Sequence, residues 1–241
     1  MVQIYKTKTG ELFYLSCQKI AFMRILFVAA TSFEVESLKL KVESQNNASN
    51  FEPSTLNFKL LITGVGMVAT AYALGRELSK NQYDLVVNLG IAGSFDRSFA
   101  LGDVVEITED TLAELGAEDD EAFLPITQMG FGESAFKATE SLYNFYKTAN
   151  LKQATAITVN TVHGNEASIQ KIQARLNAQI ESMEGAAFFY ACKEAGVACI
   201  QIRAVSNYVE KRNRDNWKIG LAVNNLNTFA AALIEELQII P

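Results

Sequence analysis

Five short runs of apolar residues divide this chain, and each run is continuous rather than alternating. Continuous runs of this length are typical of strands buried on both faces, as in a sheet that helices cover on each side. The runs lie at 25–30, 58–62, 85–91, 154–159 and 198–205. Patterns typical of helices alternate with them, at 66–79, 166–177, 184–195 and 221–237. This alternation predicts the α/β fold class, with a mostly parallel or mixed sheet.

Two segments carry more local predictions. The expected helix at 66–79 places Val68, Tyr72, Leu74 and Leu78 on one stripe, which we predict to be buried. The segment 109–121 is strongly acidic, and charge blocks of this kind are usually solvated loops or frayed helices.

The charge balance limits the classes of partner. The 241 residues include 21 Lys and Arg against 27 Asp and Glu, so the formal net charge is −6. An acidic chain is a poor nucleic-acid binder, because binding the phosphate backbone requires a basic stripe. No apolar run is long enough to span a bilayer, and the first 22 residues lack the apolar core of a signal peptide. We expect residues 1–22 to be an N-terminal extension and residues 23–241 to form one domain.

Cysteine and histidine are too few and too scattered for a structural zinc site. The chain has three cysteines and one histidine, with no CxxC pair. We therefore expect no metal and no cofactor, and we interpret Cys17, Cys192 and Cys199 as reduced thiols of a cytoplasmic protein.

A glycine turn follows the second apolar run. Gly64, Gly66 and Ala69 match the G-x-G-x-x-A pattern of dinucleotide-binding turns, with Asp84 about twenty residues later. Asp84 precedes an apolar run instead of ending one, so it lies at the wrong end of its strand to reach a ribose. Two other interpretations stay open: a tight turn for close packing, or a turn whose N–H groups face a small anion.

A second small-residue turn, 90–94, follows the third run, and its small residues allow something to approach the backbone closely. Ser94 does not sit in the G-x-S-x-G pattern of a nucleophilic serine, and His163 would be its only possible base.

Two glutamates follow apolar runs. Glu34 comes after the first run, and Glu184 opens the alanine-rich helix in the sequence ESMEGAAFF. Each alone is explained as an acid in the first turn of a helix, where the helix dipole favours it. Together they lie beside the carboxyl ends of strands, where ligands bind in open α/β sheets. The pair therefore marks a candidate site.

Several other polar residues follow the runs and have ordinary structural explanations. Asn207 lies just past the fifth run, as turn residues often do. His163 suits a loop histidine with a satisfied hydrogen bond, and Arg212 and Trp217 suit a basic surface loop with one aromatic side chain tucked in.

These pieces, in this order, resemble the purine nucleoside phosphorylase/uridine phosphorylase superfamily. They are most similar to its hydrolytic branch, which contains methylthioadenosine/S-adenosylhomocysteine nucleosidase. The matching segments are FVAATSFEVESL, ITGVGMVATAYAL, VVNLGIAGSF, LGDVVEI, ESMEGAAFFYACKEAGV and QIRAVSNYVEKRNRDNW, and they cover most of residues 23–238. The resemblance implies a three-layer α/β/α sandwich, whose mixed, twisted sheet curls into a partial barrel, and a homodimer.

The same resemblance assigns roles to residues of this chain. Glu34 matches a glutamate that activates water, and Met183 with Glu184 matches a pair that binds ribose. Asn207 stands where the family binds the purine. Further expected substrate contacts are Gly93, His163, Ser206, Arg212 and Trp217.

Two departures from relatives refine the expected reaction. Phosphorylases of the superfamily bind phosphate with arginines near the glycine turns. Neither turn here contains one, since Arg76 lies too far along its helix and Arg97 lies past its turn. Because a desolvated phosphate dianion needs charged donors, we expect water as the nucleophile and hydrolysis as the reaction.

The second departure concerns the base. Adenine-cleaving nucleosidases carry an aspartate where this chain has Asn207, whose NH2 group can donate to O6 or N7 of a 6-oxopurine but cannot protonate a leaving group. We therefore expect a hypoxanthine nucleoside, futalosine of the menaquinone route, as substrate, with Arg212, Arg214 and Trp217 as candidates for its benzoate group. Two alternatives stay open: a nucleosidase for methylthioadenosine or aminodeoxyfutalosine, and a non-catalytic purine-binding module.

Overall fold

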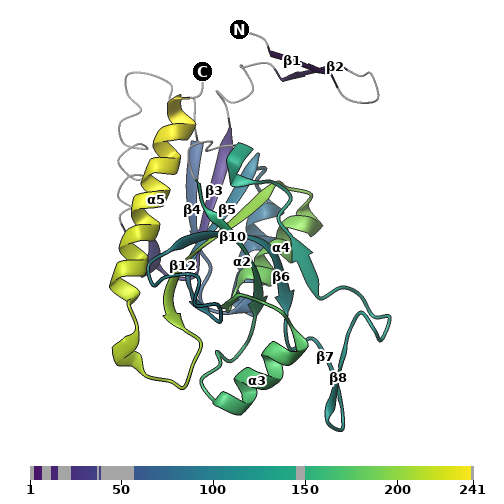
Figure 1. Ribbon diagram of the computed structural model, residues 1–241. Coiled ribbons are helices and arrows are strands. Elements are labelled where there is room, and N and C mark those ends of the chain that lie inside the picture. The colour runs from purple at the N-terminus through teal and green to yellow at the C-terminus, as the bar shows by residue number, and fades with distance from the viewer. Residues whose placement is uncertain are drawn as a thin grey trace.

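The computed structural model describes residues 3–6, 12–15, 23–36, 38, 57–144 and 150–239. At the N-terminus, β1 (Gln3–Lys6) pairs with β2 (Leu12–Leu15) as an antiparallel hairpin. The remaining described residues build one large sheet, its helices and a second hairpin (Figure 1). The domain boundary at Met23 stays a prediction, and Cys17 lies outside the described residues.

The five apolar runs all form strands of the large sheet. These strands are β3 (Arg24–Ala29), β4 (Asn57–Ile62), β5 (Leu85–Ser94), β10 (Lys152–Thr158) and β12 (Cys199–Tyr208). Three further strands, β6 (Val104–Leu112), β9 (Ala135–Lys137) and β11 (Ile180–Ser182), complete it. The order is β11-β10-β6-β12-β5-β3-β4, with β9 paired to β6.

The sheet is mixed, and part of it closes on itself. Strand β12 runs parallel to β5 and antiparallel to β6, whereas β4, β3 and β5 are all parallel. At the far end of the order, β11 pairs antiparallel with the end of β5, so that Glu181 lies opposite Gly93. This pairing joins β5, β12, β6, β10 and β11 into a ring, the partial barrel that the resemblance implied.

Helices cover both faces of the sheet. Ile25 and Phe27 of β3 pack with α5 (Ile219–Ile239), whereas Leu26 and Val28 face the opposite layer, which contains α2 (Met67–Leu78) and α4 (Gly185–Ala195). Burial of successive residues on opposite faces explains why the strands read as continuous apolar runs. The predicted three-layer α/β/α architecture is confirmed. In Figure 1, α5 runs along one side of the sheet.

Helix α3 (Glu166–Arg175) buries Ile169 and Ile172, and α4 is capped at its C-terminus by Gly196 in the left-handed region (φ 63°). The remaining short helical turns are η2 (Ser32–Val35), η3 (Leu142–Asn144) and η4 (Arg214–Asn216).

One local prediction is wrong in part, and a second is wrong over most of its segment. On α2, Leu74 is buried and Leu78 packs against the core as predicted, but Val68 and Tyr72 are 78% and 69% exposed, because they lie on another side of the helix. The acidic segment 109–121 is neither a loop nor a frayed helix over most of its length. It holds the end of β6 and all of β7 (Gly116–Asp119), which pairs with β8 (Ala122–Pro125) in the second hairpin.

Candidate active site

The carboxyl ends of β3, β5 and β12 surround a cavity of about 340 Å³. Because these strands are parallel, the residues that follow them meet at one edge of the sheet. Nine of the ten residues that the sequence analysis assigned to the substrate or the reaction line this cavity: Glu34, Gly93, His163, Met183, Glu184, Ser206, Asn207, Arg212 and Trp217. We call it the catalytic cavity.

Glu34 is held by the turn that follows β3. One carboxylate oxygen, Oε2, accepts from the backbone N–H of Thr31 at 2.9 Å and from its hydroxyl at 3.0 Å. The other, Oε1, accepts from the N–H of Ile91 at 3.2 Å. The side chain is only 7% exposed. Glu34 is therefore a buried carboxylate with a fixed orientation at the wall of the cavity.

A hydrogen bond to Glu184 accounts for the glycine at the first turn. The N–H of Gly66 donates to Glu184 Oε1 at 2.9 Å, and the φ of 95° at Gly66 belongs to the left-handed region that favours glycine. Of the open interpretations, the structure therefore supports a turn that faces an anion, and the anion is a carboxylate of the chain itself. Asp84 instead accepts from the N–H of Arg24 at the amino end of β3, which removes the dinucleotide interpretation.

Arg203 is the main site residue that sequence reasoning missed. It lies in the middle of β12, is 1% exposed, and interacts electrostatically with Glu184, Glu34 and Asp110. Burial raises the pKa of Glu184, while the charge of Arg203 and the N–H of Gly66 act against that rise. The available signal was an arginine inside an otherwise apolar strand, a position where an unpaired charge is very costly.

Gly90 makes room for this arrangement. A Cβ atom at Gly90 would lie 3.2 Å from Arg203 Nη1 and 3.3 Å from Glu34 Oε1. The close approach predicted for the second turn is therefore that of a guanidinium and a carboxylate. Ser94 is 1% exposed and its hydroxyl points at backbone carbonyls, including that of Asp96 at 2.8 Å, so it is not an available nucleophile.

A buried hydrogen-bond network supports the start of α4. Asp110, fully buried, accepts from Thr158 Oγ1 at 2.8 Å and from Gln201 Nε2 at 2.9 Å, and Thr158 Oγ1 accepts from the N–H of Ala186. Burial is the main cause that raises the pKa of Asp110 to about 6. Gly185 fits against this network, since a Cβ there would lie 2.0 Å from Asp110 Oδ2. The network fixes the turn that carries Glu184.

Asn207 and Gly93 form the opposite side of the cavity. The Ser206 hydroxyl lies 2.8 Å from Asn207 Oδ1, and Asn207 Nδ2 donates to the carbonyl of Tyr208 at 3.0 Å. A Cβ at Gly93 would lie 3.2 Å from Asn207 Nδ2 and 2.9 Å from a methyl group of Val209. The missing side chain at Gly93 therefore keeps the space beside the Asn207 amide open.

His163 is paired with a buried acid that sequence reasoning did not identify. Glu181 is 3% exposed, and its carboxylate accepts from the N–H of His163 at 2.9 Å and bonds the ring nitrogen Nδ1 of the same residue. Burial raises the pKa of Glu181, and the hydrogen bonds from His163 oppose that rise. The ring of Phe95 packs edge-on against the imidazole, with centroids 6.4 Å apart.

The basic loop after β12 closes another side. The guanidinium of Arg212 lies 4.9 Å from the centroid of the Trp217 ring, and that of Arg214 lies 6.0 Å from it. Arg212 and Trp217 line the cavity, whereas Arg214 does not.

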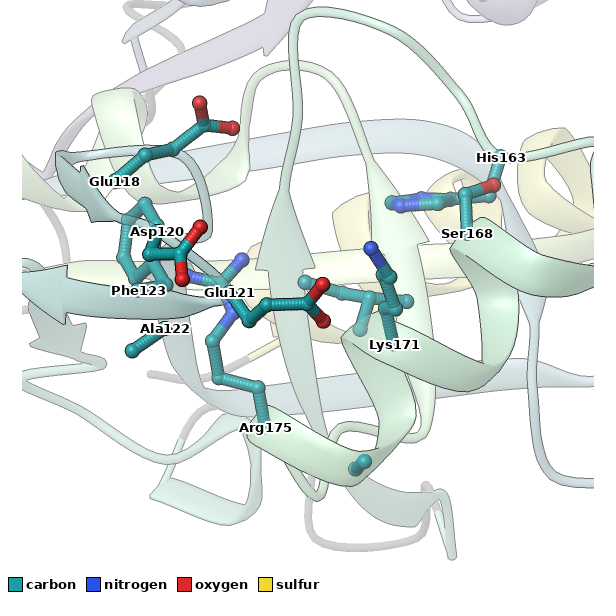
Figure 2. Close-up of a pocket in the computed structure, with 11 residues that line it drawn as sticks. Glu118, Asp120, Glu121, Ala122, Phe123, His163, Ser168, Lys171 and Arg175 are labelled. Carbon is teal, nitrogen blue, oxygen red and sulfur yellow. The ribbon is translucent and has the colours of Figure 1, made fainter.

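A second, larger cavity of about 660 Å³ lies between the β7–β8 hairpin and α3 (Figure 2). We call it the side pocket. Its acids Glu118, Asp120 and Glu121 come from the hairpin, and its bases Lys171 and Arg175 come from α3. Figure 2 shows His163 at its edge, and the same residue lines the catalytic cavity, so the two hollows meet there.

No cluster of three or more potential metal ligands occurs among the residues that the structure describes. Within the same residues, no helix is both long and apolar enough to cross a bilayer.

Comparison with known families fits this site. The model of the phosphorylase superfamily matches residues 24–238, so the chain belongs to that superfamily. The futalosine hydrolase of Streptomyces coelicolor is 32% identical over 228 residues, which cover 90% of this chain and 97% of the relative. The futalosine hydrolase of Thermus thermophilus is 29% identical over 184 residues, covering 74% of this chain and 82% of the relative. Within the superfamily, the chain therefore falls in the futalosine hydrolase family.

Solved structures share the fold. The native futalosine hydrolase of Helicobacter pylori strain 26695 superimposes with a TM-score of 0.73 at 16% identity, over 89% of this chain and 98% of that chain. The methylthioadenosine/S-adenosylhomocysteine nucleosidase of Colwellia psychrerythraea, solved in complex with adenine, gives a TM-score of 0.71 at 22% identity, over 91% and 96%. At such identities the likeness shows the fold alone.

Proposed function

We propose that this protein hydrolyses the N-glycosidic bond of futalosine, releasing hypoxanthine and dehypoxanthinyl futalosine in menaquinone biosynthesis. One observation carries the proposal: two oriented carboxylates, the buried Glu34 and the half-buried Glu184, line the same cavity as an asparagine amide. The relatives named futalosine hydrolase support the same substrate.

Water rather than phosphate is the nucleophile. The N–H of Gly66, which an anion at the first glycine turn would use, already donates to Glu184. A phosphate there would meet a carboxylate, and like charges at short range repel each other strongly in a buried site. Glu34 orients the water and takes its proton as the oxygen attacks C1′ of the ribose.

Glu184 binds the ribose hydroxyls, with Met183 packed beneath the sugar. Its negative charge also favours the oxocarbenium-like transition state, in which positive charge develops on the sugar. Arg203 lies beside both glutamates, and its buried positive charge opposes the rise in the pKa of Glu184 that burial and the nearby Glu34 carboxylate cause.

Asn207 selects the base. With Oδ1 beside the Ser206 hydroxyl, its NH2 group is the part that can face a ligand, and an NH2 group donates to the O6 or N7 acceptor of a 6-oxopurine. The 6-amino group of an aminopurine would instead face the NH2 group of Asn207, and two hydrogen-bond donors cannot bond to each other. His163 and Gly93 border the base, and Arg212 and Trp217 are the candidates for the benzoate end of futalosine.

The first test measures free-base release from futalosine, aminodeoxyfutalosine, methylthioadenosine and inosine, each with and without phosphate. We expect hypoxanthine from futalosine at a rate independent of phosphate. Adenine released from the 6-amino substrates at an equal rate would favour the alternative nucleosidase. Tight purine binding without turnover, unaffected by Glu34→Gln, would favour a binding module.

A second test addresses the base. Asn207→Asp should raise turnover of aminodeoxyfutalosine relative to futalosine, because a carboxylate accepts from a 6-amino group and a carboxylic acid can protonate N7. Ratios of kcat/KM for the two substrates measure this change. An unchanged ratio would mean that Asn207 does not read the 6-position.

The protein works as a cytoplasmic homodimer. Four apolar side chains at or near the cavity mouth are exposed, and such a patch is typical of a protein interface: Phe33 57%, Val65 57%, Val68 78% and Tyr72 69%. Two of them, Phe33 and Val65, also line the cavity, so a partner seated here would close it. Val68→Lys should lower the mass measured by sedimentation equilibrium from dimer to monomer. An unchanged mass would place the interface elsewhere.

A further inference from the structure

Breaking the glycosidic bond leaves an electron pair on N9 of the purine, and the departing base becomes neutral only if a proton reaches one of its ring nitrogens. Asn207 cannot supply that proton, because an amide N–H is not acidic in the relevant range. A second group in the cavity is therefore needed for acid catalysis of departure. This reasoning rests on the proposed function.

The His163–Glu181 pair is suited to that task. The carboxylate of Glu181 binds both the backbone N–H and the Nδ1 of His163, so Nδ1 carries a proton and the ring has a fixed orientation. Among the described residues, the other ring nitrogen, Nε2, has no hydrogen-bond partner within the protein. Nε2 is thus the nitrogen of His163 that is available to a ligand.

Sheet register places the pair opposite Asn207. Gly93 of β5 lies between two strands, with Glu181 of β11 as its partner on one side and Asn207 of β12 as its partner on the other. Side chains of directly paired residues point to the same face of a sheet, and neighbouring strands lie about 4.8 Å apart. A purine above the bare backbone of Gly93 would therefore have the Asn207 amide at one edge and the His163–Glu181 pair at the other.

The nearest charged group to the His163 ring is a buried carboxylate. Glu181 is 3% exposed, and a buried carboxylate requires a cationic or strongly donating partner, which here is His163. Glu114 adds a further negative charge that acts on Glu181. The other charged groups around the ring are Arg212, which lines the catalytic cavity, and the side-pocket residues Glu118, Asp120, Glu121, Lys171 and Arg175.

We propose that His163 is the general acid of the reaction and that Glu181 is the residue that positions it. As the C1′–N9 bond breaks and its electron pair moves to the purine, the Nε2 proton of His163 passes to a purine ring nitrogen. The oxygen of water bonds to C1′, and Glu34 takes the proton that water loses. Hypoxanthine leaves neutral, and both protein groups return to their starting states by proton exchange with solvent.

His163 lines both the side pocket and the catalytic cavity (Figure 2).

The test compares futalosine with its N7-methyl derivative, whose purine carries a fixed positive charge and leaves without a proton. In the full-length enzyme, His163→Gln should lower kcat for futalosine roughly 10²–10⁴-fold, which is the usual contribution of a general acid. The same variant should lower kcat for the N7-methyl derivative by no more than about threefold, since that substrate needs no acid. Glu181→Gln should show the same selectivity with a smaller loss, and it provides the test if His163→Gln does not fold.

Lys171→Gln is the matched control, because Lys171 lines the side pocket beside His163 but not the catalytic cavity. It should leave kcat for both substrates within about twofold. Equal losses for both substrates in His163→Gln, or no loss for futalosine, would overturn the proposal. If the wild type releases no hypoxanthine from futalosine, the proposed function fails separately, and inosine with 7-methylinosine then provides the same comparison.

Discussion

The two cavities that meet at His163 differ in how their charges are held. The side pocket has nearly twice the volume, about 660 against 340 Å³, and five charged side chains from the hairpin and α3. Among these, Arg175 lies against the ring of Phe123 at 3.7 Å, and Lys171 is exposed. The catalytic cavity has fewer charges, but its carboxylates Glu34 and Glu181 are 7% and 3% exposed.

Neither the volume of a cavity nor the number of its charged side chains therefore identifies a catalytic site. In the catalytic cavity, backbone N–H groups of Thr31, Ile91 and Gly66 fix the carboxylates in place. Charges that are desolvated and fixed in this way interact strongly with a developing charge, whereas exposed charges are screened by water and salt.

Glu34→Gln tests the most firmly held carboxylate. The amide keeps the size of the side chain but cannot take a proton from water, so we expect kcat for futalosine to fall roughly 10²–10⁴-fold with little change in KM. Steady-state kinetics measure both values. A loss confined to KM would assign Glu34 to binding rather than to proton transfer.

Asp110→Asn tests the buried network beneath α4 through the pH dependence of stability. Burial raises the pKa of Asp110 to about 6, so between pH 4 and 6 the folded chain keeps a proton that the unfolded chain loses. This group therefore lowers the stability of the wild type by about 3 kcal/mol as pH rises through that window, and its contribution is constant below and above it.

The Asp110→Asn variant has no carboxyl group that titrates at this position. Its free energy of unfolding, relative to that of the wild type, should therefore rise as the pH increases from 4 to 6. Urea unfolding at pH 4, 5, 6 and 7 measures it. Parallel curves for the two proteins would show that Asp110 does not titrate there.

Gly66→Ala tests the backbone donor to Glu184. A φ of 95° is unfavourable for alanine, and we expect a loss of about 1–2 kcal/mol in the free energy of unfolding. Relief of that strain would move the N–H away from Glu184 and lower kcat. Gly75→Ala, in the middle of α2 with open space around its Cβ position, is the control and should stabilise the protein slightly. Equal stabilities of the two variants would contradict the role assigned to Gly66.

Glu121→Gln tests the side pocket. Its carboxylate is exposed on the hairpin turn, so removal of the charge should change kcat and KM for futalosine by less than about twofold. A large rise in KM would mean that the side pocket holds part of the substrate, and the contrast between the two cavities would then fail.

Local patterns in the sequence were enough to predict the main strands and the two glutamates of the site. Continuous apolar runs identified β3, β5 and β12, because a strand covered on both faces contains few polar residues. Glu34 and Glu184 could be placed together since ligands bind beside the carboxyl ends of strands in open α/β sheets. These inferences needed only local patterns and one general rule of topology.

The hydrogen-bond and charge partners of these residues could not be predicted in the same way. The pairing of Glu181 with Gly93 brings the end of β11 beside β5, and no local pattern specifies which strand closes the ring. The contact of Gly66 with Glu184 spans 118 residues, and the burial of Arg203 beside two glutamates depends on three separate elements. Hydrogen bonds and charge pairs between distant segments form only when the folded sheet brings those segments close together. Apolar periodicity, in contrast, is a property of neighbouring residues along the chain and can be recognised without the fold.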